Sequence, residues 1–204
     1  MKKSSAAKID RTLPGREEMI ERVAALVPSL VERAEQVEKT RTIHPDTVQE
    51  LWDTQLWSVI KPKRYGGLEL DYGMMVDVPD YIARGCASTS WIYGNLVIHD
   101  WMLAMWPPQG QDAVWKDNPR ALMASSLVAN AGRATPATGG YIISGRWPYC
   151  SGIDISDWMM MAAMIQDDGP KRPIWLVVPR AEFEEIDTWH VSGLIGTGSR
   201  DVKC

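Results

Sequence analysis

The spacing of apolar residues predicts helices over the first half of the chain. Between residues 16 and 40, Met19, Val23 and Leu26 begin a series that recurs at steps of three or four positions, and this period is typical of an amphipathic helix. Pro28 lies inside the series, so we expect a kink or an interruption there. A second helix is expected to begin at Pro45, because proline is favoured at the first helical position.

Residues 74–106 also carry a helical pattern, and turn-forming residues near Gly85–Ser88 divide it into two segments. The run Pro107–Asp112 contains two prolines and a glycine and is expected to end the last helix. We therefore predict a flexible arm over residues 1–13 and an all-α domain of four or five helices over residues 14–118.

After Asn118 the pattern changes to short apolar runs separated by turn-forming residues, which is typical of strands at hairpin spacing. The dipeptides Gly139–Gly140 and Ser144–Gly145 are expected to form turns. Residues 119–204 are therefore predicted to form a mostly antiparallel β domain, which gives the whole chain an α+β fold. The runs expected to contain strands are 121–128, 138–152, 158–165, 174–178 and 185–196.

Composition places the chain in the ordinary globular class and argues against several kinds of partner. Of its 204 residues, 45% are hydrophobic and 24% are charged, and the formal net charge is −4, so we expect no nucleic-acid partner. The first residues lack the apolar run of a signal peptide, and no window is apolar for long enough to span a bilayer. We therefore expect no membrane partner. Cys86, Cys150 and Cys204 are far apart and predict neither a disulfide framework nor a metal site, so we expect a protein of the reducing cytoplasm.

The motifs of the commonest enzyme classes are absent from the sequence. The chain has no Walker loop, no Gly-x-Gly-x-x-Gly after a strand, no His-Glu-x-x-His and no Gly-x-Ser-x-Gly. His44, His99 and His190 are too widely spaced to predict a metal site. The aromatic residues are ten Trp, six Tyr and one Phe. Because a buried indole N–H needs a hydrogen-bond partner, we expect much of this aromatic surface at interfaces or pocket walls.

Several polar residues are candidates for chemistry, and each also has a simpler structural interpretation. His99 lies in an otherwise apolar helical stretch. It is either a hydrogen-bonded core histidine or an imidazole that polarises or deprotonates a substrate hydroxyl. Ser125 and Ser126 close the first expected strand, and Thr197 and Ser199 belong to a Thr-Gly-Ser run. These hydroxyls are either solvated strand ends or groups that bind the polar edge of a heteroaromatic ring.

The run Ser-Gly-Arg-Trp-Pro-Tyr-Cys-Ser-Gly at residues 144–152 raises the same choice. In a regular strand, Trp147, Tyr149 and Ser151 point to one face of the sheet and Cys150 points to the other. The first face then presents two aromatic rings and a hydroxyl, which suits a flat ring system with a polar edge. Simple sheet packing is the alternative, because Trp and Tyr are common strand residues.

Four segments carry a resemblance to a known family. They are IKPKRYGGLELD (60–71), STSWIYGNLVIHDW (88–101), GGYIISGRWPYCSGIDISDW (139–158) and GLIGTGSRDV (193–202). With these segments the chain resembles the acyl-CoA dehydrogenase superfamily, and within it the oxygenase components of two-component flavin-dependent monooxygenases that hydroxylate phenols. The third segment is the most specific, because its Ser-Gly-x-Trp-x-aromatic-x-Ser-Gly pattern followed by Asp-Trp is typical of this branch.

The resemblance implies a site for reduced FMN or FAD that a separate flavin reductase supplies. It also implies O₂ as a second substrate and hydroxylation of a small aromatic substrate through a C4a-hydroperoxyflavin. Carried over by position, Ser151 would lie near flavin N5 and Tyr149 beside the ring, and both His99 and Ser151 would be catalytic. The remaining residues that the resemblance implies are Ser125, Ser126, Trp147, Thr197 and Ser199 for the flavin, and Trp91, His99 and Trp101 for the substrate.

Two departures from the family pattern leave rival functions open. Ile155 stands where the branch often has a histidine. The family's C-terminal helical bundle, which completes the flavin site and builds a homotetramer, is missing from the chain, so we expect a fragment that is inactive alone. The rival functions are an acyl-CoA dehydrogenase or oxidase, and a non-catalytic fragment that keeps the fold without binding flavin. The Ser-Ser run of the first strand, and Tyr-Cys-Ser in place of Trp-Ile-Thr, favour the monooxygenase.

Overall fold

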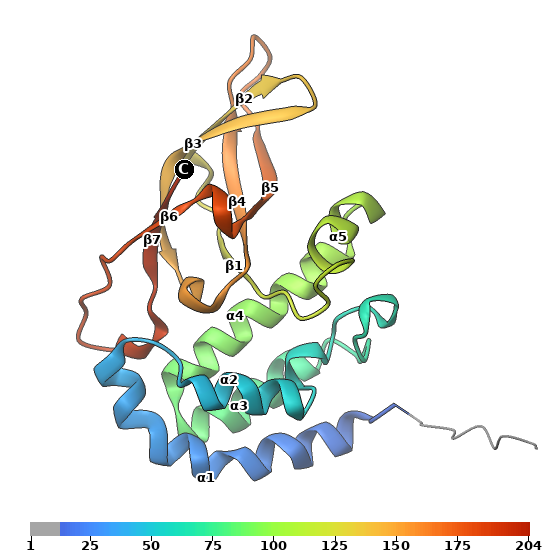
Figure 1. Ribbon diagram of the computed structural model, residues 1–204, viewed down its shortest axis with the longest axis vertical. Helices are drawn as coiled ribbons and strands as arrows, with labels where there is room; N and C mark the ends of the chain where they lie inside the picture. The colour runs from blue at the N-terminus through green and yellow to red at the C-terminus, as the bar shows by residue number, and fades with distance from the viewer. Residues whose placement is uncertain (1–12) are drawn as a thin grey trace, which may run out of the picture.

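The computed structural model describes residues 13–204, so the arm expected over residues 1–13 lies, except for its last residue, outside the described residues. The helices gather in one half of the molecule and the strands in the other (Figure 1). The α-helices are α1 (Arg16–Thr40), α2 (Pro45–Asp53), α3 (Met74–Gly85), α4 (Ala87–Ala104) and α5 (Pro108–Trp115), and short 3-10 turns cover Leu56–Ser58 and Lys63–Tyr65.

Two expectations rested on prolines. Helix α1 is not interrupted at Pro28, but its ribbon bends part-way along its length, which agrees with the alternative of a kink (Figure 1). Next to this position Leu30 packs so closely on Gly85 of α3 that an added Cβ would lie 2.6 Å from the Leu30 Cβ, and this tertiary contact stabilises the helix across the missing hydrogen bond. The preceding helix α4 does end just before the run Pro107–Asp112, at Ala104, but the run also begins a further helix, because Pro108 takes the first helical position of α5.

The strands form one curled sheet whose order is β1-β4-β2-β3-β7-β6, with β5 paired to β4. Strand β4 is parallel to β1 and β2, whereas the other four pairs are antiparallel. The predictions of a mostly antiparallel sheet and an α+β fold are therefore confirmed. The strands are β1 (Met123–Ser126), β2 (Gly132–Ala137), β3 (Gly140–Cys150), β4 (Trp158–Ile165), β5 (Pro173–Pro179), β6 (Glu184–Ile186) and β7 (Arg200–Lys203).

Strand β3 does not alternate in the way that its sequence predicts. The strand runs straight through the expected turn at Ser144–Gly145, and its register with β7 shifts between Trp147 and Cys150. Trp147 and Cys150 are both fully buried, whereas Tyr149 is 68% exposed and adopts a left-handed backbone with φ of 63°. The prediction that Trp147 and Tyr149 share one face is therefore wrong, because a bulge turns them to opposite sides.

Helix α4 connects the helical half to the sheet. It lies between helices α1–α3 and the strands (Figure 1), and it is buried on two sides. On one side the Tyr93 hydroxyl donates to the Leu56 carbonyl over 2.8 Å, and on the other the His99 ring contacts the Met123 carbonyl of β1. The helices and the sheet thus share one core. The predicted domain boundary at residues 118–119 falls between α5 and β1 and stays a prediction.

The run expected as a strand over 185–196 is a strand only at its start, since β6 ends at Ile186. The segment beyond it is held instead by side chains at the C-terminal end of α1, those of Glu38 and of the C-cap residue Arg41. The Arg41 guanidinium contacts both carboxylate oxygens of Asp187 at 2.6 Å. The Glu38 carboxylate accepts hydrogen bonds from the Ile195 and Gly196 N–H groups over 3.1 and 3.3 Å. Helix α1 therefore fixes the segment that leads into the Thr-Gly-Ser run.

Candidate functional site

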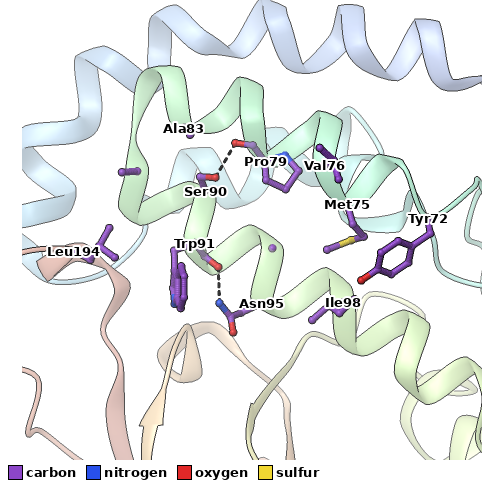
Figure 2. Close-up of a pocket in the computed structure, with 12 residues that line it drawn as sticks. Tyr72, Met75, Val76, Pro79, Ala83, Ser90, Trp91, Asn95, Ile98 and Leu194 are labelled. Carbon is purple, nitrogen blue, oxygen red and sulfur yellow. Dashed lines mark hydrogen bonds between the residues drawn. The ribbon is translucent and has the colours of Figure 1, made fainter.

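Helix α4 carries Trp91, Asn95 and His99 at steps of four residues, which is the spacing of side chains along one helix face. Trp91 is 52% exposed, and its indole N–H donates to the Ser151 hydroxyl over 3.0 Å. Figure 2 shows the Trp91 ring and the Asn95 side chain pointing the same way from α4, with Leu194 beside the ring. Two of the residues predicted from sequence, Trp91 and Ser151, are thus in direct contact.

An apolar groove of about 600 Å³ lies next to Trp91, between α3 and α4. Its walls are mostly hydrocarbon and aromatic, and Asn95 and Ser90 are among the few polar residues that line it. The apolar residues in Figure 2 include Tyr72, Met75, Val76, Pro79, Ile98 and Leu194. A groove of this composition suits a bulky apolar or aromatic group.

A cluster of three buried hydroxyls lies where β3 ends and β7 begins. Ser151 is 7% exposed, Ser199 3% and Thr197 1%. The Ser199 hydroxyl lies 2.7 Å from the Ser151 hydroxyl and 2.7 Å from the Thr197 hydroxyl. The structure therefore brings together both ends of the predicted polar site, although the two serines are far apart in sequence.

His99 is 3% exposed, and its Nδ1 lies 2.8 Å from the Met123 carbonyl oxygen. Because a carbonyl only accepts, Nδ1 carries the proton and Nε2 is left with a lone pair. Burial lowers the pKa of His99 to about 4, despite the opposing effect of the hydrogen bond. The imidazole is therefore neutral at physiological pH and can accept a hydrogen bond at Nε2.

The other residues predicted from sequence lie on β1, on β3 and further along α4. Ser126 is 6% exposed at the end of β1, with Ser125 before it. The exposed Tyr149 ring meets Trp189 edge-on at 6.4 Å between centroids. Trp101 is 41% exposed but lies further along α4, where it contacts Tyr72 edge-on at 5.2 Å.

Trp147 lies in the core rather than at the surface. Its side chain is fully buried, its indole N–H donates to the Ala162 carbonyl over 2.7 Å, and it packs directly over Gly132, where a Cβ has no room. The indole is therefore not available to a ligand at the hydroxyl cluster, and we do not include it in the proposed flavin site.

A family profile described as "Acyl-CoA dehydrogenase, N-terminal domain" matches residues 14–115, which is half of the chain. The chain belongs to the acyl-CoA dehydrogenase family. The match covers the five α-helices, including the residues of α4 that face the hydroxyl cluster.

Within the acyl-CoA dehydrogenase family, the chain is similar to hydroxylases. It is 34% identical to the FADH(2)-dependent resorcinol hydroxylase oxygenase component of a Rhizobium species, over 89% of this chain and 45% of the relative. Its fold matches the crystal structure of the HsaA monooxygenase from M. tuberculosis with a TM-score of 0.89 and 29% identity, over 93% of this chain and 52% of that one. It also matches XiaF from Streptomyces in complex with FADH2 and glycerol, with a TM-score of 0.86 and 34% identity, over 92% and 48% of the two chains. The chain spans about half the length of the relatives that it matches.

The residues at the junction of α4 and the hydroxyl cluster, where Trp91 meets Ser151, fit a flat ring with a polar edge. Ser151 is hydrogen-bonded to Trp91 and lies two positions after Tyr149, and both aromatic rings are more than half exposed. Flat apolar surface thus lies beside buried hydroxyls, as an isoalloxazine ring requires. Among the described residues, no group of His, Cys, Asp or Glu side chains is arranged to hold a metal ion. Nor does any helix between residues 13 and 204 have the length and apolar character to cross a membrane.

A buried ion pair next to His99 was not predicted from sequence. Lys61 is fully buried in the loop after α2, with its ammonium 3.6 Å from the Asp100 carboxylate and 2.9 Å from the Pro119 carbonyl oxygen. It also lies over the rings of Trp52 and Trp115, 5.5 and 5.4 Å from their centroids. Burial raises the pKa of Asp100 to about 7, although Lys61 lowers it. The one feature of the sequence that could have indicated this ion pair is a lysine in a turn-rich loop.

The neutral state of His99 predicts a pH effect on stability. In the folded protein the pKa of His99 is about 4, so the ring stays neutral down to that pH. In the unfolded protein the ring is protonated below about pH 6.5. The contribution of His99 to the free energy of unfolding is therefore present above pH 6.5 and is lost as the pH falls toward 4. Replacing His99 with Gln should remove this part of the pH dependence, measured by urea unfolding between pH 4 and 8. An NMR titration in which the wild-type His99 ring becomes protonated near pH 6.5 would contradict the expectation.

Proposed function

We propose that the chain forms the helical and sheet portions of the oxygenase component of a two-component flavin-dependent monooxygenase that hydroxylates an aromatic or phenolic substrate. The observation that carries the proposal is the junction of Trp91 on α4 with the Ser151 and Ser199 hydroxyls. This junction combines exposed aromatic surface with a buried polar edge. The names of the similar proteins, which include a resorcinol hydroxylase and a p-hydroxyphenylacetate 3-hydroxylase, support the same reaction class.

In this proposal the hydroxyl cluster holds the flavin. Ser151, with Ser199 and Thr197 behind it, faces flavin N5, and Tyr149 provides apolar surface beside the ring. Ser125 and Ser126 at the end of β1 lie toward the polar edge of the ring. Bound reduced FMN or FAD would supply the electrons and the site at which O₂ is activated. The protein contributes orientation and keeps water from the reacting atoms.

His99 orients the substrate. Its Nε2 has no partner among the described residues and carries a lone pair, so it accepts a hydrogen bond from a phenolic hydroxyl. With a pKa of about 4 it is a weak base, so we assign it to holding the phenol proton in position while negative charge develops on the oxygen. Trp91 and Trp101, both on α4 and both exposed, offer ring surfaces for the aromatic body of the substrate.

The proposal extends to partners. A separate flavin reductase supplies the reduced flavin, which then reaches this chain by diffusion. The complete protein is proposed to be a cytoplasmic homotetramer.

Anaerobic titration with reduced FMN and reduced FAD tests the proposal, followed by admission of O₂ in the presence of resorcinol or p-hydroxyphenylacetate. In a version extended to the length of its relatives, we expect binding of at least one reduced flavin and formation of a hydroxylated product, whereas the 204-residue chain alone should form none. Replacing His99 with Gln should lower product formation by roughly 10²-fold, the usual contribution of one acid–base group. Flavin affinity should stay the same, and hydrogen peroxide should replace product. The matched control is His190→Gln, because His190 is a surface histidine with 66% side-chain exposure.

Two results would count against the proposal. One is the failure of both reduced flavins to bind. The other is tight binding of oxidised FAD that is bleached by an acyl-CoA, which would assign the chain to the dehydrogenase reaction.

A further inference from the structure

A continuous chain of hydrogen bonds runs from the exposed ring of Trp91 to a main-chain carbonyl. The Trp91 indole contacts the Ser151 hydroxyl at 3.0 Å, and Ser151 contacts the Ser199 hydroxyl at 2.7 Å. Ser199 contacts the Thr197 hydroxyl at 2.7 Å, and Thr197 contacts the Leu194 carbonyl oxygen at 2.9 Å. Each hydroxyl in the chain has one proton to give and two lone pairs.

The two ends of the chain fix the direction of every proton in it. The Leu194 carbonyl can only accept, so the Thr197 hydroxyl donates to it. Thr197 then has no further proton, so Ser199 donates to Thr197. By the same count Ser151 donates to Ser199, and the Trp91 indole, which can only donate, gives its proton to Ser151.

The accepting end of the chain is rigidly held. The Leu194 carbonyl also accepts from the Thr197 N–H and from the Trp189 indole, each over 3.1 Å. The next two N–H groups, those of Ile195 and Gly196, donate to the Glu38 carboxylate. The carbonyl therefore keeps its direction toward Thr197, and the orientation of the three hydroxyls follows from it.

We infer that Thr197 and Ser199 make Ser151 an obligate hydrogen-bond acceptor, and that this polarity selects reduced over oxidised flavin. The inference rests on the proposed function, in which Ser151 faces flavin N5. After its bonds to Trp91 and Ser199, the Ser151 oxygen has one lone pair left and no proton. Reduced flavin carries a hydrogen on N5 and can donate it to that lone pair. Oxidised flavin has a lone pair on N5 and would meet another lone pair.

Thr197 and Ser199 are therefore positioning residues that act on flavin through Ser151. Removing either hydroxyl interrupts the hydrogen-bond chain at that residue. In Ser199→Ala the Ser151 hydroxyl loses the acceptor of its hydrogen bond. Its O–H can then turn toward N5 and donate to it, which favours the oxidised flavin. In Thr197→Val, Ser199 loses its acceptor and can donate to Ser151 instead, which leaves the Ser151 O–H free to turn as well. Thr197→Ser keeps the hydroxyl and should retain the wild-type direction.

The test compares dissociation constants for reduced FMN, measured anaerobically, with those for oxidised FMN. The wild-type protein should bind the reduced form more tightly. The preference should shrink by about tenfold in Ser199→Ala and in Thr197→Val, since one matched hydrogen bond contributes about that factor, and Thr197→Ser should restore it. The matched control is Ser156→Ala, because Ser156 is a buried serine that donates to the Gly152 carbonyl over 2.8 Å and lies outside the chain.

A second readout needs no flavin. Because hydrogen bonds in a chain strengthen one another, Ser151 is a better acceptor while it donates to Ser199. The indole N–H resonance of Trp91, assigned with Trp91→Phe, should therefore move upfield in Ser199→Ala and stay in place in Ser156→Ala.

The outcomes separate this inference from the proposed function. If neither form of FMN or FAD binds, the proposed function fails, and the indole resonance still tests the polarity of the chain. If flavin binds but Ser199→Ala and Thr197→Val leave the preference for reduced flavin unchanged or larger, the proposed function stands and the inference is overturned.

Discussion

Replacing Lys61 with Met is expected to lower the free energy of unfolding by about 3–5 kcal/mol at pH 8, the usual cost of leaving one partner of a buried ion pair alone. Lys61 is fully buried and Asp100 is 3% exposed. Without the ammonium, the Asp100 carboxylate loses its cation and the Pro119 carbonyl loses a donor. Methionine fills much of the same volume, so the loss reports on charge more than on packing. Chemical denaturation of both proteins measures it.

The same variant should show a distinctive pH dependence. In the wild type the folded pKa of Asp100 is raised to about 7 from 3.8, so the folded state holds a proton that the unfolded state has released. The contribution of Asp100 to the free energy of unfolding therefore falls as the pH rises from about 4 to about 7 and is flat above, opposite in sign to the contribution of His99. Loss of Lys61 raises this pKa further, so the variant should keep losing stability above pH 7 and should be closer to wild type at pH 5.

Two further variants control the Lys61 experiment. Lys61→Met combined with Asp100→Leu should recover much of the stability, because a buried pair can be replaced by apolar side chains with little loss. Arg16→Met removes a partner of Asp77 in an ion pair whose arginine side chain is 52% exposed, and should have little effect. A Lys61→Met protein as stable as wild type at pH 8 would disprove the structural role of the pair.

The second large effect is expected at Trp147. Replacing it with Ala should lower the free energy of unfolding by about 3–5 kcal/mol, the range for a fully buried aromatic residue. The substitution leaves a cavity over Gly132 and removes the indole donor to the Ala162 carbonyl of β4. Trp147→Phe should lose less, because the ring still fills most of the space. Urea unfolding followed by far-ultraviolet circular dichroism measures all three proteins.

Tyr149 is the matched control for Trp147, since it lies two positions further along the same strand but is 68% exposed. Tyr149→Ala should have nearly wild-type stability. If Tyr149 lies beside the flavin as proposed, the same variant should bind flavin more weakly. If Trp147→Ala kept the wild-type free energy of unfolding and Tyr149→Ala prevented folding, the result would contradict the burial of Trp147 and the exposure of Tyr149 that the bulge in β3 produces.

Periodicity was enough to predict most elements, because long amphipathic helices and apolar strands have distinct repeats. Helix α1 and strand β4 were expected at the positions where they occur. The bulge in β3 could not be predicted in this way. Trp147 and Cys150 both point into the core, yet three-residue spacing puts them on opposite faces of a regular strand. An extra residue between Trp147 and Cys150 brings both side chains to the buried face. The sequence pattern alone does not show which side chains of the strand are buried.

The candidate site was predicted from residue type and family pattern, but its connections were not. Ser151 and Ser199 were both candidates, and nothing in the sequence indicated that their hydroxyls touch. The pair Lys61–Asp100 was missed because charged residues in loops and helices are usually solvated. The role of Glu38, which holds the backbone before the Thr-Gly-Ser run, depends on contacts between segments at opposite ends of the described chain.

The contacts of α1 also imply an order of folding. Glu38 meets Ile195 and Gly196 across 157 and 158 positions of sequence, and Arg41 meets Asp187 across 146. Closing such large loops is slow and costs much entropy, so these contacts form only after more local structure is in place. On the ribosome, the helices and the first strands emerge long before Ser199 does. The hydroxyl chain is therefore among the last features to assemble, and an intermediate with a largely formed core and no polar site is expected to precede the native state.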